Sequence, residues 1–177
     1  MNTFATSAGL ITVTQAQVAD VDKILAILTG VGAWLAAKGI DQWGPNRFSR
    51  EGSAAAIERG EVYIARLGGK IVGTLRLQWS DALLWGSFSD GAGYIHALAV
   101  ERAFTGHQIG LGLLRWAERK VAATGRKFLR LDCMAANLAL RNYYLKSGFR
   151  FVAEIEKNDW SAALFEREAT QIKETST

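Results

Sequence analysis

Apolar residues recur along the chain at two different periods, and the switch between these periods predicts a mixed α/β protein. Apolar spacings of three and four place side chains on one helix face, whereas alternating or continuous apolar runs are typical of strands. The helix pattern runs from a start between Thr14 and Asp20 to Gly39, and over 49–59, 110–124 and 138–147. The strand pattern covers 10–14, 61–67, 71–79, 94–100, 128–134, 150–156 and 162–168. Because the two patterns alternate, we expect helices layered against a sheet.

Glycine and polar residues mark the boundaries of these segments. Gly68-Gly69-Lys70 lies between two strand runs and predicts a hairpin. Ser49 is a candidate helix cap, and Gly125 and Gly148 are expected to end helices. Residues 80–93 are rich in Gly, Ser and Asp and therefore predict a loop.

Length and composition are those of an ordinary globular domain. The 177 residues are 49% hydrophobic and 21% charged, which excludes a disordered or collagen-like chain. We expect one domain over 1–177, ordered over about 10–168, with loose polar tails at 1–9 and 170–177.

The charge pattern argues against a nucleic-acid or membrane partner. The net charge of +4 is compatible with an anionic ligand, but no run of Lys and Arg exceeds two residues, which favours scattered solvated charges.

Cys133 is the one cysteine, so no internal disulfide forms. Residues 1–9 lack a signal-peptide pattern, and no stretch reaches the roughly 18 apolar residues of a membrane span. We expect a soluble cytoplasmic protein.

The central motif is a glycine turn, His107-Gln108-Ile109-Gly110-Leu111-Gly112, which follows a strand and opens a helix. A helix start leaves about four backbone N–H groups unpaired and carries about half a positive charge. Glycines let a phosphate approach those N–H groups, so the turn is a candidate pyrophosphate site. In the alternative interpretation the glycines only permit a tight turn and close packing.

A nicotinamide-type dinucleotide site is a rival interpretation of the same turn. Asp132 lies 20 residues after Gly112, where such a fold places its ribose-binding acid. Two features argue against it. Arg115 occupies the third glycine position, and nine residues separate Val100 from Gly110, which is too many for the tight strand-to-helix turn.

A second set of residues extends the pattern downstream of the turn. In chain order the motifs are Leu98-Ala99-Val100, the Gly110/Gly112 turn, Asn137 with Tyr144 seven residues later, and Gly148-Phe149. Taken together, this order resembles the GCN5-related N-acetyltransferase (GNAT) superfamily over about Tyr94 to Phe151. One position departs from the family pattern: His107 stands where the family has Gln or Arg, with Gln108 beside it.

The resemblance implies a fold and a cofactor. The fold is a mixed, mostly antiparallel sheet flanked by helices, with a splayed parallel strand pair at the cofactor site. Acetyl-CoA is the implied acyl donor, without a metal. The residues implied to bind it are Leu98, Ala99, Val100, His107, Gln108, Ile109, Gly110, Leu111, Gly112, Leu113, Asn137 and Tyr144. A neutral His107 offers one donor and no charge, so either phosphate binding relies more on backbone N–H groups or the chain is shifted by one residue relative to the family pattern. Asn137 is equally a candidate helix N-cap.

The resemblance also implies catalytic roles. Tyr144 is the implied general acid for the departing thiolate, a transfer that a site stabilising the phenolate would make easier, and the alternative is a core tyrosine. His96 is the candidate base because it lies two residues before Leu98 on one strand and so faces the same side, although a structural histidine is an alternative. Asp132 and Glu101 are weaker candidate bases.

The acceptor is expected to be a primary amine of a small molecule or peptide, bound by 34–48 and 79–93. Four tryptophans there form either a cation–π pocket or ordinary packing: Trp34, Trp43, Trp79 and Trp85.

Cys133 is interpreted as a small buried residue rather than a nucleophile. The leading function is direct N-acetyl transfer, and the alternative is a non-catalytic acyl-CoA-binding module on the same fold. The resemblance is compatible with a homodimer.

Overall fold

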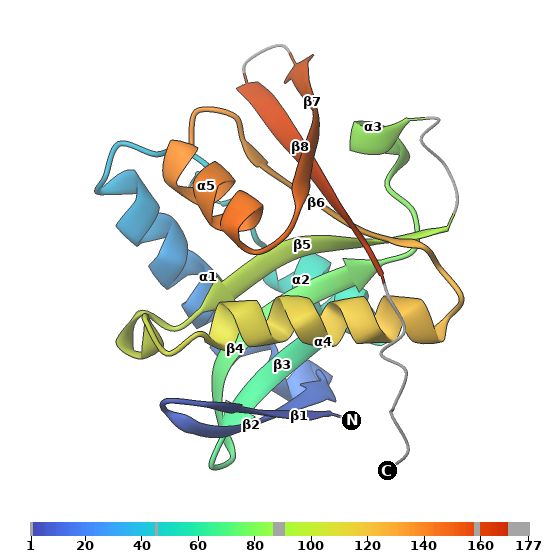
Figure 1. The fold of residues 1–177 in the computed structure, drawn as a ribbon. Helices are drawn as coiled ribbons and strands as arrows, with labels where there is room; N and C mark the ends of the chain where they lie inside the picture. The colour runs from blue at the N-terminus through green and yellow to red at the C-terminus, as the bar shows by residue number, and fades with distance from the viewer. Residues whose placement is uncertain (1, 45, 87–90, 158–159, 170–177) are drawn as a thin grey trace. The chain divides into compact units, whose positions relative to one another are not determined.

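A computed structural model describes residues 2–44, 46–86, 91–157 and 160–169 (Figure 1). The strands in these ranges are β1 (Thr3–Thr6), β2 (Gly9–Gln15), β3 (Val62–Leu67), β4 (Lys70–Gln78), β5 (Ala92–Val100), β6 (Phe128–Met134), β7 (Arg150–Lys157) and β8 (Trp160–Glu168). Their order in the sheet is β1-β2-β3-β4-β5-β6-β8-β7. The mixed α/β sheet that the sequence predicts is confirmed.

The helices alternate with these strands along the chain. They are η1 (Val18–Asp20), α1 (Val21–Ala36), α2 (Arg50–Glu58), α3 (Ala82–Trp85), η2 (Arg102–Phe104), α4 (Ile109–Ala123) and α5 (Leu138–Lys146), where η marks a 3₁₀ turn. None of the helices within the described ranges is long and apolar enough to span a membrane. The chain divides into two compact units, a first unit of Met1–Leu77 with His96–Leu113 and a second of Gln78–Ile95 with Leu114–Thr177.

The first unit begins with a hairpin that the sequence did not predict. β1 pairs antiparallel with β2 from Thr3↔Thr12 to Thr6↔Gly9, so only Ser7 and Ala8 lie in the turn. The Thr6 hydroxyl donates to the Gly9 carbonyl at 2.9 Å. The expectation of a loose tail over 1–9 is therefore wrong for Thr3–Thr6, because β2 supplies a hydrogen-bonding edge for this short strand.

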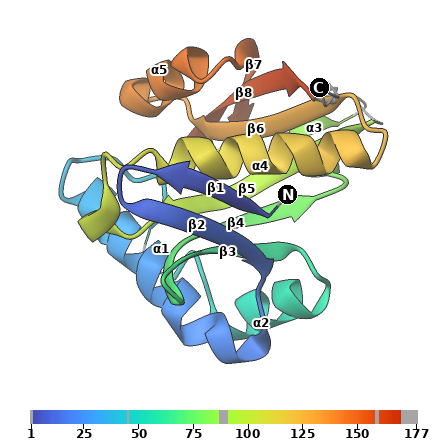
Figure 2. The ribbon, with the colours of Figure 1, turned by 60° about the horizontal axis from the view of Figure 1, so that its bottom comes forward.

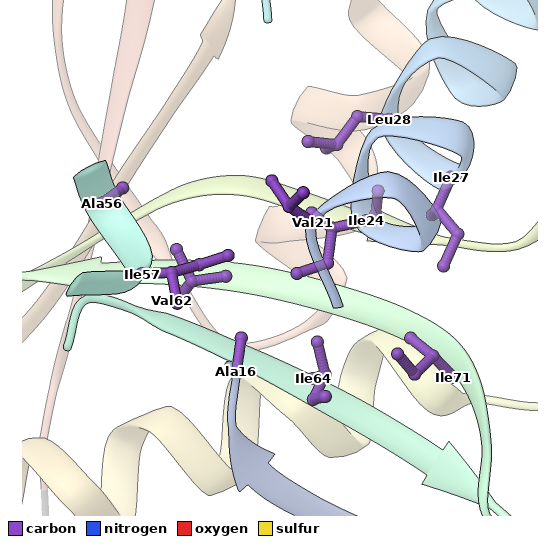
Figure 3. Close-up of a cluster of buried hydrophobic side chains, with 11 residues drawn as sticks. Ala16, Val21, Ile24, Ile27, Leu28, Ala56, Ile57, Val62, Ile64 and Ile71 are labelled. Atoms are coloured by element: carbon purple, nitrogen blue, oxygen red, sulfur yellow. The ribbon is translucent and has the colours of Figure 1, made fainter. Parts of the chain in front are cut away.

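The β3–β4 hairpin is confirmed. Gly68 and Gly69 have φ values of 54° and 84°, which is the conformation that a two-residue turn between right-twisted strands requires. Beside β2–β4, α1 and α2 cover one face of the strands, as Figure 2 shows. Their apolar residues meet those of β3 and β4 in the core cluster drawn in Figure 3, which includes Ile24, Ile57 and Ile64.

The second unit contains the parallel strand pair. β5 pairs with β6 in parallel from Ala92↔Phe128 to Ile95↔Leu131, and both strands continue beyond these pairs. β6 then pairs antiparallel with β8, and β8 pairs antiparallel with β7. Of the strand pairs described within the two units, β5–β6 is parallel and the other five are antiparallel, as expected of a mostly antiparallel sheet with a parallel pair.

Helix boundaries agree with the capping signals in the sequence. The Ser49 hydroxyl accepts a hydrogen bond from the Gly52 amide at 3.0 Å, which confirms it as the cap of α2. Gly125 and Gly148, with φ values of 75° and 87°, follow the ends of α4 and α5. The expected loop over 80–93 instead contains α3, whose first turn is capped by the Asp81 side chain, and its residues 87–90 lie outside the described ranges.

Candidate functional site

The glycine turn opens α4 with two residues in the left-handed region. Gly106 has φ 88° and Gln108 has φ 60°, and a non-glycine residue in this region costs about 1–2 kcal/mol. The Gly112 amide donates to the Gln108 carbonyl at 3.0 Å. The amides of residues 109–111 precede this bond and are available to an anion rather than to the helix. The turn therefore fits a phosphate group, and Gly106 is a part of it that the sequence motif missed.

Gly112 also has a packing role. The Phe4 ring of β1 lies directly against it, so that a Cβ atom on residue 112 would overlap the ring. The close-packing interpretation of this glycine is thus supported by the structure. It is compatible with phosphate binding, because a phosphate would meet backbone amides rather than the Cα atom.

Replacing Gly112 by Ala tests the packing role. An overpacking cost of about 1–3 kcal/mol against Phe4 opposes a helix-propensity gain of about 1 kcal/mol. In a Phe4→Ala background the overlap disappears, and the substitution is expected to stabilise the protein. Urea unfolding of the four variants should give a coupling energy of about 1–3 kcal/mol. Additive effects of the two substitutions would contradict the packing role.

His107, which departs from the family pattern, contacts the β1–β2 turn. The hydroxyl oxygen of Ser7 lies 2.9 Å from Nδ1 of His107, and the imidazole is half-buried. The side chain is thus held by a residue 100 positions away in sequence. No local pattern in the sequence signals this contact.

The end of β5 lies in the first unit and departs from regular alternation. Ala97 has φ 49°, so the period-two argument that placed His96 on the same side as Leu98 does not apply across it. Ala99 is 3% exposed and belongs to the core cluster of Figure 3. Glu101, a weaker candidate base, forms an ion pair with Lys23 at 2.9 Å. The role of His96 stays a prediction.

Tyr144 lies in the second unit, inside an aromatic cluster. Its ring centroid is 5.7 Å from those of Tyr143 and Phe165 and 6.0 Å from that of Phe149. Burial raises the pKa of its phenol well above 10, and Cys133 raises it further. Desolvation penalises the charged form, so the surroundings of the Tyr144 hydroxyl do not favour its phenolate. The phenol carries its proton at neutral pH, which is the state a general acid needs.

Burial also determines the chemistry of the one cysteine. Desolvation, with a contribution from Asp132, raises the pKa of the Cys133 thiol to about 12. Thiolate is the nucleophilic form of cysteine, so this residue is disfavoured as a covalent catalyst. The interpretation of Cys133 as a small buried residue is confirmed.

Asn137 begins α5 as its N-cap. Its Oδ1 accepts a hydrogen bond from the Leu140 amide at 3.1 Å, and the residue is 3% exposed. The capping interpretation is thus confirmed, while a contact with a pantetheine arm stays a prediction.

A residue that the sequence did not single out is Asp81, whose carboxylate lies within 4.8 Å of that of Asp132.

The tryptophans of the expected acceptor segments have partners within the chain. In the first unit, the Arg102 guanidinium lies 3.8 Å from the centroid of the Trp34 ring, and Trp43 packs edge-on against Phe48. In the second unit, arginines lie 5.0 Å from the Trp79 ring and 4.7 Å from the Trp85 ring. The packing interpretation is supported by these contacts. Residues 45 and 87–90 of these segments lie outside the described ranges.

Comparisons with known proteins identify the family. A family model for the acetyltransferase (GNAT) family matches residues 30–149. The chain is similar to the uncharacterized N-acetyltransferase YesJ of Bacillus subtilis (strain 168), with 32% identity over 85% of this chain and 86% of that protein. It is similar to the structure of a GNAT acetyltransferase from Listeria monocytogenes 4b F2365, with TM-score 0.81, 27% identity, and coverage of 94% of this chain and 99% of that one. The PaiA N-acetyltransferase of Thermoplasma acidophilum, in complex with coenzyme A, shares the fold at TM-score 0.68 and 20% identity, over 89% and 98% of the chains.

The family assignment decides between the alternatives for the glycine turn. A dinucleotide site built on Asp132 belongs to a different fold from the one described above. The match to the family model covers the turn, the β5 strand and α5 together. The chain therefore belongs to the GNAT family of acetyltransferases.

Proposed function

We propose that the protein transfers an acetyl group from acetyl-CoA to a primary amine of a small molecule or peptide by direct attack of the amine. The observation that carries the proposal is the start of α4 in a GNAT-family chain. Gly106 and Gln108 adopt left-handed conformations there, and the amides of residues 109–111 precede the first helical hydrogen bond. Supporting it, the Thermoplasma relative was solved in complex with coenzyme A.

The residues of the turn and of β5 would bind the donor. The turn from His107 to Leu113 would hold the pyrophosphate through backbone amides. The main chain at Leu98, Ala99 and Val100 would pair with the amides of the pantetheine arm, as an added strand does. Asn137 would contact the same arm while its Oδ1 caps α5. Bound acetyl-CoA would supply the acetyl group as a reactive thioester.

Two side chains would move protons during transfer. The amine loses a proton as its nitrogen bonds to the acetyl carbon, and we assign that proton to His96, directly or through water. The bond from acetyl carbon to sulfur breaks, and the sulfur takes a proton from the Tyr144 hydroxyl. The raised pKa of the Cys133 thiol favours this direct route over an acyl-cysteine intermediate.

Binding and turnover test the proposal separately. Acetyl-CoA at 100 times its dissociation constant is expected to stabilise the fold by about 2.7 kcal/mol, measured as a shift in thermal unfolding. Thiol release is then followed with polyamines, aminoglycosides, amino acids and peptides as acceptors. Stabilisation together with thiol release supports the enzyme. Stabilisation without release for any acceptor favours a non-catalytic acyl-CoA-binding module, and no stabilisation contradicts both.

A further inference from the structure

We propose that Ser7 is a positioning residue, whose hydroxyl fixes the tautomer of His107 so that Nε2–H donates to the anionic group bound at the start of α4. The inference rests on the proposed function, because the anion is the phosphate portion of coenzyme A. It assigns a role in cofactor binding to the β1–β2 hairpin, which lies outside the sequence motifs of the family.

The contact itself limits the chemistry. Ser7 Oγ lies 2.9 Å from His107 Nδ1, a hydrogen-bonding distance. A hydroxyl can donate or accept, whereas a neutral imidazole carries its proton on one nitrogen only. When the hydroxyl donates to Nδ1, the ring proton resides on Nε2. In the opposite arrangement Nε2 presents a lone pair, which an anion repels. A bound phosphate and a donating serine therefore favour the same tautomer.

The partners are held in place from both sides. On the hairpin side, the Thr6 hydroxyl donates to the Gly9 carbonyl and accepts from the Ala8 amide at 3.2 Å, which fixes the turn that carries Ser7. On the helix side, His107 lies between two left-handed residues that set its backbone position.

The packing of Phe4 joins the two sides. Its ring lies against Gly112 one turn into α4, and β1 and the beginning of that helix lie side by side in Figure 2. The hairpin is thus anchored to the helix start independently of the Ser7–His107 hydrogen bond. Removing the hydroxyl of Ser7 should for this reason leave the backbone in place.

This arrangement gives a physical account of the departure at His107. Glutamine or arginine at this position always presents an N–H donor, because its donor atoms are fixed by covalent structure. A neutral histidine presents a donor at Nε2 only in the Nε2–H tautomer, which a hydrogen bond accepted by Nδ1 stabilises. Ser7 would supply that bond. Histidine together with Ser7 would then provide the donor that glutamine or arginine provides at this position in the family.

Imidazole ¹⁵N chemical shifts and coenzyme A affinity test the inference. The chain has two histidines, so a His107→Gln spectrum identifies the His107 signals by difference. At pH 8.5 the wild type is expected to show the Nε2–H tautomer. Ser7→Ala should give a mixture of tautomers, and Ser7→Thr, which keeps the hydroxyl, should restore the single form.

The affinity for coenzyme A should follow the same pattern if the Nε2–H tautomer of His107 donates to the phosphate. Ser7→Ala is expected to weaken coenzyme A binding about 3- to 10-fold by calorimetry, the effect of one hydrogen bond. Ser7→Thr should bind as the wild type does, and pantetheine, which lacks the pyrophosphate, should bind both proteins equally. In a His107→Gln background, Ser7→Ala should have no further effect, because glutamine needs no partner to present its donor.

The outcomes that overturn the inference are distinct from those that overturn the proposed function. A wild-type His107 in the Nδ1–H tautomer, or a Ser7→Ala protein with unchanged coenzyme A affinity, removes the role of Ser7 and leaves the proposed function standing. A wild-type protein that does not bind coenzyme A overturns both. An equal loss of affinity for pantetheine and coenzyme A in Ser7→Ala indicates a structural role alone.

Discussion

Replacing Tyr144 by phenylalanine is expected to lower kcat for acetyl transfer by about 10²-fold, with little change in KM for acetyl-CoA. The change removes only the hydroxyl. The ring keeps its place against Phe149 and Phe165, so the core of the second unit is retained. The loss would then report the proton that the departing sulfur no longer receives. Steady-state kinetics at saturating amine, with thiol release as readout, measure both parameters.

Burial of Tyr144 changes what is expected of its pH dependence. Desolvation raises the pKa of the phenol well above 10, so the hydroxyl keeps its proton as the pH rises through 9 and beyond. Activity is thus expected to increase with pH as the acceptor amine, with an ordinary pKa near 10.4, loses its proton. No descending limb below pH 10 should come from Tyr144.

The neighbouring tyrosine provides a matched control. Tyr143 is 37% exposed and is the other tyrosine of α5. Tyr143→Phe removes an equivalent hydroxyl one residue away and should leave kcat within about twofold of the wild type. Equal losses for the two variants, or an unchanged kcat for Tyr144→Phe, would remove Tyr144 as the general acid.

The long elements of this fold were predictable because each carries a complete periodic pattern and a terminating residue. β6 was predicted with the observed bounds, Phe128–Met134, and Gly125 and Gly148 marked the ends of their helices. Among the strands and α-helices of the described ranges, the two that were missed, β1 and α3, have four residues each. Four residues are too few to show a period, and their formation depends on a neighbouring strand or a capping side chain rather than on local preference.

The features of the candidate site likewise divide into those that the sequence could predict and those that it could not. The glycine turn and Asn137 as a cap were predictable because their physical reasons are local. The contacts of Gly112 with Phe4 and of His107 with Ser7 join residues about 100 positions apart, and nothing near either partner signals them. The left-handed Ala97 was equally invisible, since alanine does not favour that conformation and tertiary structure must impose it. The raised pKa of Tyr144 depends on its burial. The sequence alone gave a core position as only one of two interpretations of this residue.

A buried ion pair in the second unit carries the other large expected effect. Arg130 of β6 and Glu166 of β8 are 6% and 4% exposed. Arg130 Nε donates to Glu166 Oε2 at 2.8 Å, and its Nη1 donates to the Tyr94 hydroxyl at 3.1 Å. The guanidinium also lies 4.7 Å from the Trp85 ring centroid. These contacts compensate the cost of removing both charges from water.

Arg130→Met is therefore expected to lower the free energy of unfolding by about 3–5 kcal/mol, because it leaves the buried Glu166 carboxylate without its buried partner. Glu166 keeps a second ion pair with Arg150, whose side chain is 68% exposed, and an exposed cation screens a buried carboxylate poorly. Arg150→Met is the matched control and should cost less than about 1 kcal/mol. Urea unfolding followed by circular dichroism and by tryptophan fluorescence gives both values and shows whether the units unfold together. Equal costs for the two arginines would mean that solvent reaches the pair, and that β6 and β8 are held by their backbone ladder and apolar contacts alone.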